Sequence, residues 1–213
     1  MPDQTPVDLF ALADLVTPWC IHTVATLHVA EQIAAGHERC DEIAEAVGCD
    51  GVALRGVLRH LAERGVFEEP EPGRFTMNSA AQAFLEPGMQ LMLDLNSIGG
   101  RFAAAWSTLP DYVRTGKPAY ADLFGRPFWE DLAAHPQLSE AFDALMGPAG
   151  HGAPDADIPL DGGWAAVRHV VDVGGGAGNL LAALLQHYEH LHGTLVDLPQ
   201  TVARSAEVFA AAG

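Results

Sequence analysis

The sequence has few basic residues and few cysteines. Lysine and arginine together number 11 against 28 aspartates and glutamates, which gives a formal net charge of −17. Binding to nucleic acid or to an anionic membrane surface needs clustered basic side chains, so this balance argues against both partners. The three cysteines match no disulfide, metal or redox spacing, and we expect reduced thiols in a cytoplasmic protein.

Targeting and membrane signals are also weak. The N-terminal stretch MPDQTPVDLF lacks the basic region of a signal peptide, and no uninterrupted apolar run approaches about 18 residues. We therefore expect a soluble chain. Hydrophobic residues make up 49% of its 213 positions, which is enough for a buried core.

The N-terminal part of the chain is predicted to be helical. Residues 7–35 carry apolar side chains at helical spacing, and Pro18 interrupts them, so we expect two helices that meet near it. The segment is apolar around much of its circumference. Such a helix is buried, and we expect a second subunit to cover it.

Residues 40–78 are predicted to form a winged helix-turn-helix. Asp41 is expected to cap a short helix, a second helix covers 51–65, and two strands at 66–69 and 74–77 flank a turn at 70–73.

This unit has two interpretations. In the first, Arg55, Arg59 and Arg64 recognise DNA. In the second, the unit is a scaffold that packs and dimerises. Three glutamates in the wing would repel phosphate, which favours the scaffold.

The rest of the first 163 residues is predicted to be helical and then irregular. Residues 79–146 are mostly helical, and 147–163 form a linker rich in proline, glycine and aspartate. Breaks are expected at 87–88, 99–100, 115–118 and 125–127. The predicted segments are a winged-helix domain at 1–100, a helical connector and linker at 101–163, and an α/β segment at 164–213.

The most specific feature is a glycine-rich loop after an apolar, β-branched stretch. Residues 170–173 lead into the glycines of 174–178, and a helix-like segment follows at 180–187. Glycines let the backbone pass close to a ligand, so strand, turn and helix N-terminus predict a nucleoside site. The next apolar stretch ends at Asp197, whose carboxylate can accept hydrogen bonds from both ribose hydroxyls.

Two other glycine-rich motifs fit less well. A Walker A loop ends in Gly-Lys-Ser/Thr, whereas Gly178 is followed by Asn179 and leucine. The dinucleotide fingerprint needs a sixth-position glycine for close packing of helix on strand, and Asn179 stands there. The remaining pattern is Asp-x-Gly-x-Gly-x-Gly, which begins at Asp172.

This pattern resembles the first motif of class I S-adenosylmethionine-dependent methyltransferases. The chain is similar to the small-molecule O-methyltransferase family of bacterial polyketide- and anthracycline-tailoring enzymes, related to plant caffeate-type enzymes. The stretches that carry the resemblance are 113–118, 124–125, 128–130, 141–146, 171–178 and 195–199. The resemblance implies an α/β protein in which a mainly helical N-terminal winged-helix dimerisation domain precedes the start of a Rossmann-like methyltransferase domain.

The resemblance also implies a cofactor site for S-adenosyl-L-methionine. The glycines would lie beneath the methionine part of the cofactor, and Asp197 would hold the ribose. Phe142 and Met146 would pack near the cofactor, and Asp172 would organise the loop. The glycines concerned are Gly174, Gly175 and Gly176.

The substrate implied by the resemblance is a small aromatic molecule. Trp106 and Met92 would line its pocket, and ordinary core packing is the alternative for both. No metal is expected, because His187, His190 and His192 straddle a helix end and would point apart.

The catalytic base stays unassigned. In methylating members of the family it is typically a histidine beyond the fourth strand of the core, and this chain ends before the third. We therefore expect the chain to lack the C-terminal half of the catalytic domain. Three explanations are open: a piece of a longer protein, a sheet completed by another chain, and a true truncation.

The leading functional interpretation is O-methylation of a phenolic or polyketide-derived small molecule by a homodimer. One alternative is a tailoring protein of hydroxylase or decarboxylase type, which binds S-adenosylmethionine without methylating. An alternative from another class is a winged-helix dimerisation or regulatory module.

Overall fold

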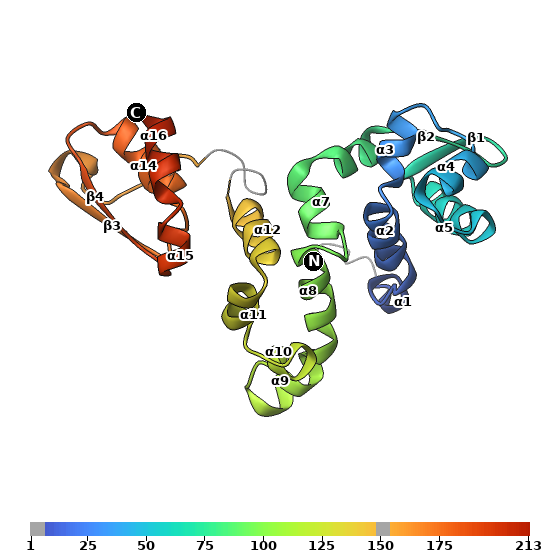
Figure 1. The fold of residues 1–213 in the computed structure, drawn as a ribbon, viewed down its shortest axis with the longest axis horizontal. Coiled ribbons are helices and arrows are strands. Elements are labelled where there is room, and N and C mark those ends of the chain that lie inside the picture. Colours follow the sequence, from blue (N-terminus) through green and yellow to red (C-terminus); the bar gives the residue numbers. More distant parts are fainter. Residues whose placement is uncertain (1–6, 148–153) are drawn as a thin grey trace, which may run out of the picture. The chain divides into compact units, whose positions relative to one another are not determined.

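The computed structural model describes residues 7–147 and 154–213 (Figure 1). The chain divides into two compact units, with the border between Arg126 and Pro127. The predicted linker at 147–163 lies partly outside the described residues. The borders of the three predicted segments stay a prediction.

The N-terminal part of the first unit is a set of short helices followed by a hairpin. Its elements are α1 (Leu9–Leu12), α2 (Val16–Thr26), α3 (Val29–Ala34), α4 (Cys40–Val47), α5 (Gly51–Glu63), β1 (Phe67–Glu71) and β2 (Arg74–Met77). The strands pair antiparallel, with Phe67 opposite Met77. Ile43 of α4 and Leu58 of α5 are fully buried with Phe67 and Phe75 of the hairpin, which confirms the predicted order of helix, helix and wing.

The predicted helix junction at Pro18 is wrong. The first break lies before it, at residues 13–15, and a second break follows α2, where His28 has a φ of 55°. The carboxylate of Asp14 accepts hydrogen bonds from the backbone N–H groups of Val16 and Thr17, at 2.8 and 3.2 Å, and so starts α2. Pro18 lies in the first turn of α2, where a missing N–H leaves no helical hydrogen bond unmade.

Two further details of the winged helix differ from the prediction. The residue that precedes α4 is Arg39, and Asp41 lies inside the first turn instead of capping it. The Glu42 carboxylate accepts a hydrogen bond from the Arg39 N–H at 3.4 Å. Strand β1 extends to Glu71, so the turn is shorter than predicted.

The N-terminal helices expose apolar side chains. Phe10 is 93% exposed, and the described stretch 7–19 also exposes Val7, Leu9, Leu12, Leu15, Val16 and Trp19. The segment Leu9–Thr26 is long and apolar enough to cross a membrane by length and composition, which the sequence analysis did not expect. It is divided into α1 and α2 and lies near the N-terminus, so it is weak evidence for a membrane span.

The C-terminal part of the first unit is helical. Its elements are α6 (Ser79–Gln82), η1 (Ala83–Leu85), α7 (Pro87–Leu93), α8 (Ile98–Ala105), η2 (Trp106–Thr108), α9 (Leu109–Thr115) and α10 (Tyr120–Phe124). The break predicted at Gly99 and Gly100 is wrong, because both lie in the first turn of α8. A Cβ on Gly99 would lie 1.9 Å from the carbonyl oxygen of Met92, and one on Gly100 would lie 1.9 Å from that of Leu95. These glycines permit close packing of α8 on the end of α7.

The second unit contains the α/β segment. Its elements are α11 (Phe128–Ala134), α12 (Pro136–Met146), η3 (Trp164–Ala166), β3 (His169–Val173), α14 (Asn179–His187), β4 (His192–Val196), α15 (Pro199–Val202) and α16 (Ser205–Ala212). Strands β3 and β4 are parallel, with His169 opposite His192 and Val173 opposite Val196. A right-handed β-α-β crossover through α14 is the ordinary connection for such strands.

Helix α14 covers one face of the two strands and packs on α16 (Figure 1). Leu181 and Leu184 of α14 are buried. Gly193 of β4 permits this packing, because a Cβ there would lie 2.8 Å from Leu181. Because β3 and β4 are parallel, their carboxyl ends lie at the same end of the sheet, beside the N-terminus of α14.

Candidate functional site

The glycine-rich loop connects the end of β3 to the start of α14. Gly174 donates a backbone hydrogen bond to the Val196 carbonyl at 2.8 Å, which ties the loop to β4. Gly174, Gly176 and Gly178 have φ values of 75°, 62° and 91°. Only glycine adopts this left-handed region without strain, so the sequence pattern directly sets the shape of the loop.

Asp197 follows β4 and holds the loop from the neighbouring strand. Its Oδ2 accepts a hydrogen bond from the Gly176 N–H at 2.8 Å, and its Oδ1 accepts one from the Leu198 N–H at 2.6 Å. The structure thus brings together the glycines and the acidic residue that the sequence analysis selected. A carboxylate oxygen accepts two hydrogen bonds, so each oxygen keeps capacity for a ligand hydroxyl.

Asp172 lies beside the loop, and its organising role stays a prediction. A Cβ on Gly175 would lie 2.3 Å from Asp172 Oδ2, so the carboxylate fills the space that a side chain at 175 would need. This oxygen is buried and has no hydrogen-bond partner among the described residues. Burial, with a smaller contribution from the charge of Asp197, raises the pKa of Asp172 above its usual value of 3.8.

The raised pKa of Asp172 predicts a pH-dependent stability. The folded chain binds this proton more tightly than the unfolded chain, so the contribution of Asp172 to the unfolding free energy falls as pH rises from 3.8 through the folded-state pKa. Asp172→Asn is therefore expected to gain stability relative to wild type as pH rises above about 4. Urea unfolding at several pH values measures this, with the exposed Asp161→Asn as control. If the difference in unfolding free energy between Asp172→Asn and wild type did not change with pH, the prediction would be wrong.

Phe142 and Met146 lie on α12. The Phe142 ring packs edge-on against Phe128 and Trp129 of α11, with ring centres 5.4 and 5.5 Å apart. Met146 is 45% exposed.

The end of α12 lies near the start of α14. A Cβ on Gly147 would lie 3.7 Å from the side-chain nitrogen of Asn179. Asp143 of α12 also forms an ion pair with Arg204, which precedes α16. The cofactor contacts predicted for Phe142 and Met146 stay a prediction.

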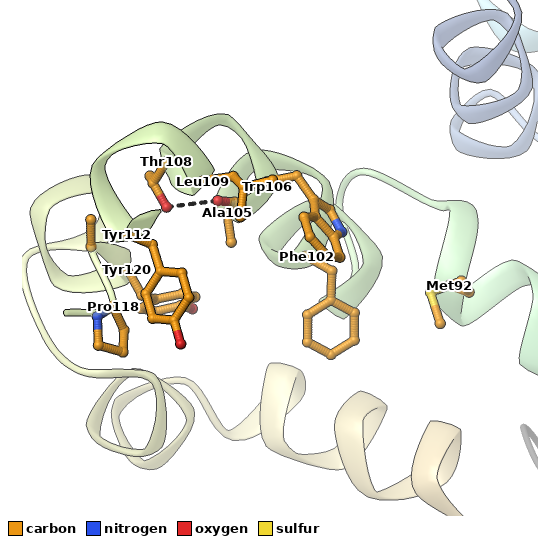
Figure 2. Close-up of a pocket in the computed structure, with 10 residues that line it drawn as sticks. Met92, Phe102, Ala105, Trp106, Thr108, Leu109, Tyr112, Pro118 and Tyr120 are labelled. Carbon is orange, nitrogen blue, oxygen red and sulfur yellow. Dashed lines mark hydrogen bonds between the residues drawn. The ribbon is translucent and has the colours of Figure 1, made fainter. Parts of the chain in front are cut away.

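A second feature, in the first unit, is a pocket of about 500 Å³ (Figure 2). It is lined mainly by apolar and aromatic side chains of α7 to α10. They include Met92, Phe102, Trp106, Leu109, Tyr112 and Tyr120. Trp106 and Met92 are 71% and 40% exposed, so both border a pocket instead of filling a core.

Only part of this pocket was predicted from the sequence. Trp106, Leu109 and Tyr112 recur at helical spacing, which is the signal that places them on one wall. Pro118 lies in the loop that follows α9, and Tyr120 is the first residue of α10. Their approach depends on how α9 and α10 pack, and no periodicity in the sequence reports that.

Of the three histidines considered as metal ligands, His190 has a backbone partner. His190 Nε2 lies 3.1 Å from the Trp164 carbonyl oxygen, and within residues 7–147 and 154–213 no group of three or more histidine, cysteine or acidic residues could hold a metal ion.

The winged-helix arginines lie against acidic groups or the wing. Arg59 and Arg64 lie 3.6 Å from the carboxylates of Glu69 and Asp14. Arg55 lies against the turn at Gly73. These neighbours favour the scaffold interpretation over DNA recognition.

Family comparisons agree with both parts of the chain. Residues 10–87 match the O-methyltransferase dimerisation domain, and residues 106–213 match the O-methyltransferase domain. A 2,7-dihydroxy-5-methyl-1-naphthoate 7-O-methyltransferase of Streptomyces carzinostaticus is 43% identical over 196 residues, which are 90% of this chain and 58% of that protein. The aclacinomycin 10-hydroxylase RdmB of Streptomyces purpurascens is 42% identical over 212 residues, 95% of this chain and 55% of that protein. The chain thus spans less than two thirds of these relatives.

A solved structure gives the same result. An O-methyltransferase from neocarzinostatin biosynthesis, in complex with S-adenosylhomocysteine and 1,4-dihydroxy-2-naphthoic acid, is 39% identical. It matches with a TM-score of 0.85 over 98% of this chain and 64% of that one. With its dimerisation region and its glycine loop held by Asp197, the chain belongs to the O-methyltransferase family.

Proposed function

We propose that the protein transfers a methyl group from S-adenosylmethionine to a phenolic oxygen of a polyketide-derived aromatic molecule in natural-product biosynthesis. The observation that carries this proposal is the glycine loop fixed by Asp197 at the carboxyl ends of two parallel strands. The naphthoate O-methyltransferase relative supports the reaction and the class of substrate.

The loop residues fit this cofactor. A Cβ on Gly174 or Gly176 would meet no atom within 4 Å, so the backbone there borders open space that a ligand can enter. Asp197 would hold the ribose through the remaining acceptor capacity of its oxygens. The carboxylate of Asp197 gives this end of the sheet a negative charge, which complements a cationic ligand.

S-adenosylmethionine, when bound, supplies an electrophilic methyl group on a sulfonium. The chain's part is to bind and orient the two reactants, because positioning provides much of the acceleration in such transfers. A phenol has a pKa of about 10, so the reaction also needs a base. We assign that base to no residue of this chain.

A second function has specific support. The aclacinomycin 10-hydroxylase is nearly as similar to the chain as the naphthoate methyltransferase. Mass spectrometry distinguishes methyl transfer from hydroxylation. The protein is incubated with methyl-labelled S-adenosylmethionine and a panel of hydroxylated naphthalenes and anthraquinones, and the masses of the products are measured. Methyl transfer adds one labelled CH₂ unit to the product. A gain of one oxygen atom without label would support hydroxylation and contradict our proposal.

We also propose that the chain forms a homodimer in the cytoplasm through its N-terminal helices. The match to a dimerisation domain supports this, as does the apolar surface of α1 and α2. Phe10→Glu would place a charge in the buried interface and is expected to convert dimer to monomer in sedimentation velocity. Val52→Glu is the control, because Val52 is also highly exposed but lies on α5. A monomeric wild type, or a Phe10→Glu variant that stays dimeric, would contradict this interface.

A further inference from the structure

The pocket in the first unit differs from an ordinary surface hollow in its lining. The rings of Phe102, Trp106 and Tyr112 give it large flat apolar surfaces, and Met92 adds an apolar side chain (Figure 2). Its volume of about 500 Å³ lies within the range of small-molecule sites. Aromatic rings in such a pocket favour planar aromatic ligands through offset or edge-on stacking.

The lining carries no formal charge. None of its ten described residues is acidic or basic. Arg101 precedes Phe102 on α8, but its guanidinium carbon lies 4.3 Å from the centre of the Phe124 ring. The lining therefore offers a carboxylate no cationic partner, whereas an uncharged aromatic ligand can stack on its rings without the cost of moving a charge from water to an apolar surface.

The polar groups of the lining differ in their availability. The Thr108 hydroxyl donates a hydrogen bond to the Ala105 carbonyl at 2.8 Å, which Figure 2 marks. The Tyr112 hydroxyl, in contrast, has no hydrogen-bond partner among the described residues. Tyr112 is 47% exposed and contributes a polar tip to a mainly apolar pocket. A hydroxyl in that position both donates and accepts.

We propose that this pocket selects uncharged, planar, oxygenated aromatic molecules, and that Tyr112 determines specificity by hydrogen bonding to an oxygen on the ring system. This inference rests on the proposed function, since it defines the substrate class of the same enzyme. It predicts a preference different from the naphthoic acid bound by the solved relative. Carboxylated aromatics would bind this chain less well than their neutral counterparts.

The test uses three probes of similar shape: methyl 3-hydroxy-2-naphthoate, 3-hydroxy-2-naphthoate and naphthalene. Equilibrium dialysis against the full 213-residue chain measures each affinity. The ester is expected to bind about tenfold more tightly than the acid, because only the acid carries a charge into the pocket. Tyr112→Phe is expected to weaken ester binding about fivefold and to leave naphthalene binding unchanged.

Two results would overturn the inference: an acid that binds as tightly as the ester, or ester binding that Tyr112→Phe leaves unchanged. Naphthalene binding by the same Tyr112→Phe sample checks that the pocket is folded, since this affinity should equal that of wild type. Failure of the proposed function would appear separately, as absent cofactor binding or absent methyl transfer in the wild type.

Discussion

Asp197→Ala is expected to lower the affinity of the chain for S-adenosylhomocysteine by about 100-fold, since two hydrogen bonds to a charged acceptor are lost. The substitution also removes the acceptor for the Gly176 N–H, so the loop loses its tie to β4 through this side chain. Both effects act on binding of the nucleoside. Isothermal titration calorimetry of wild type and variant measures the difference.

The matched control for this prediction is Glu207→Ala. Glu207 is an exposed acidic residue of α16 in the same unit, and its loss changes the net charge by the same amount. We expect its affinity to equal that of wild type. Equal affinities for Asp197→Ala and wild type would refute the ribose assignment, provided that both proteins unfold at similar temperatures.

Gly99→Ala and Gly100→Ala are each expected to destabilise the first unit by about 3 kcal/mol, because the new methyl group overlaps a backbone carbonyl oxygen. The distances of 1.9 Å from the Met92 and Leu95 oxygens are too short for any rotamer change to relieve. Either α8 moves away from α7 or the first turn of α8 unwinds. The pocket next to Met92 would then change shape.

Gly56→Ala is the control for these substitutions. Gly56 lies inside α5, and a Cβ there meets no atom within 4 Å. Alanine should therefore stabilise the helix by about 0.5–1 kcal/mol. Urea unfolding of the three variants measures the differences in unfolding free energy. Similar stability changes for Gly56→Ala and Gly99→Ala would show that close packing at α8 is not the cause.

The parts predicted correctly from sequence depend on local chemistry. Gly174, Gly176 and Gly178 have backbone angles that few other residues adopt, so the pattern itself encodes the loop. Asp197 was found because it ends the next apolar stretch, and parallel strands place such ends together. The winged helix was predicted from two stretches of helical periodicity that precede two short strands around a turn.

The parts predicted wrongly depend on packing between elements. Glycine ends a helix or permits close approach, and the sequence alone did not distinguish these roles at Gly99 and Gly100. Pro18 was taken as a junction, whereas Asp14 sets the start of the helix four residues earlier. The far wall of the pocket at Tyr120 was missed for the same reason, since its position depends on the loop before α10.

The central claim is that the glycine loop and Asp197 form the S-adenosylmethionine site of this chain. Titration of ¹⁵N-labelled chain with S-adenosylhomocysteine, followed by two-dimensional NMR, tests it residue by residue. We predict the largest shifts at the backbone amides of Gly174, Gly175, Gly176 and Leu198, and smaller or no shifts there with NAD⁺. Shifts confined to other residues, or equal shifts at these amides with NAD⁺, would contradict the assignment.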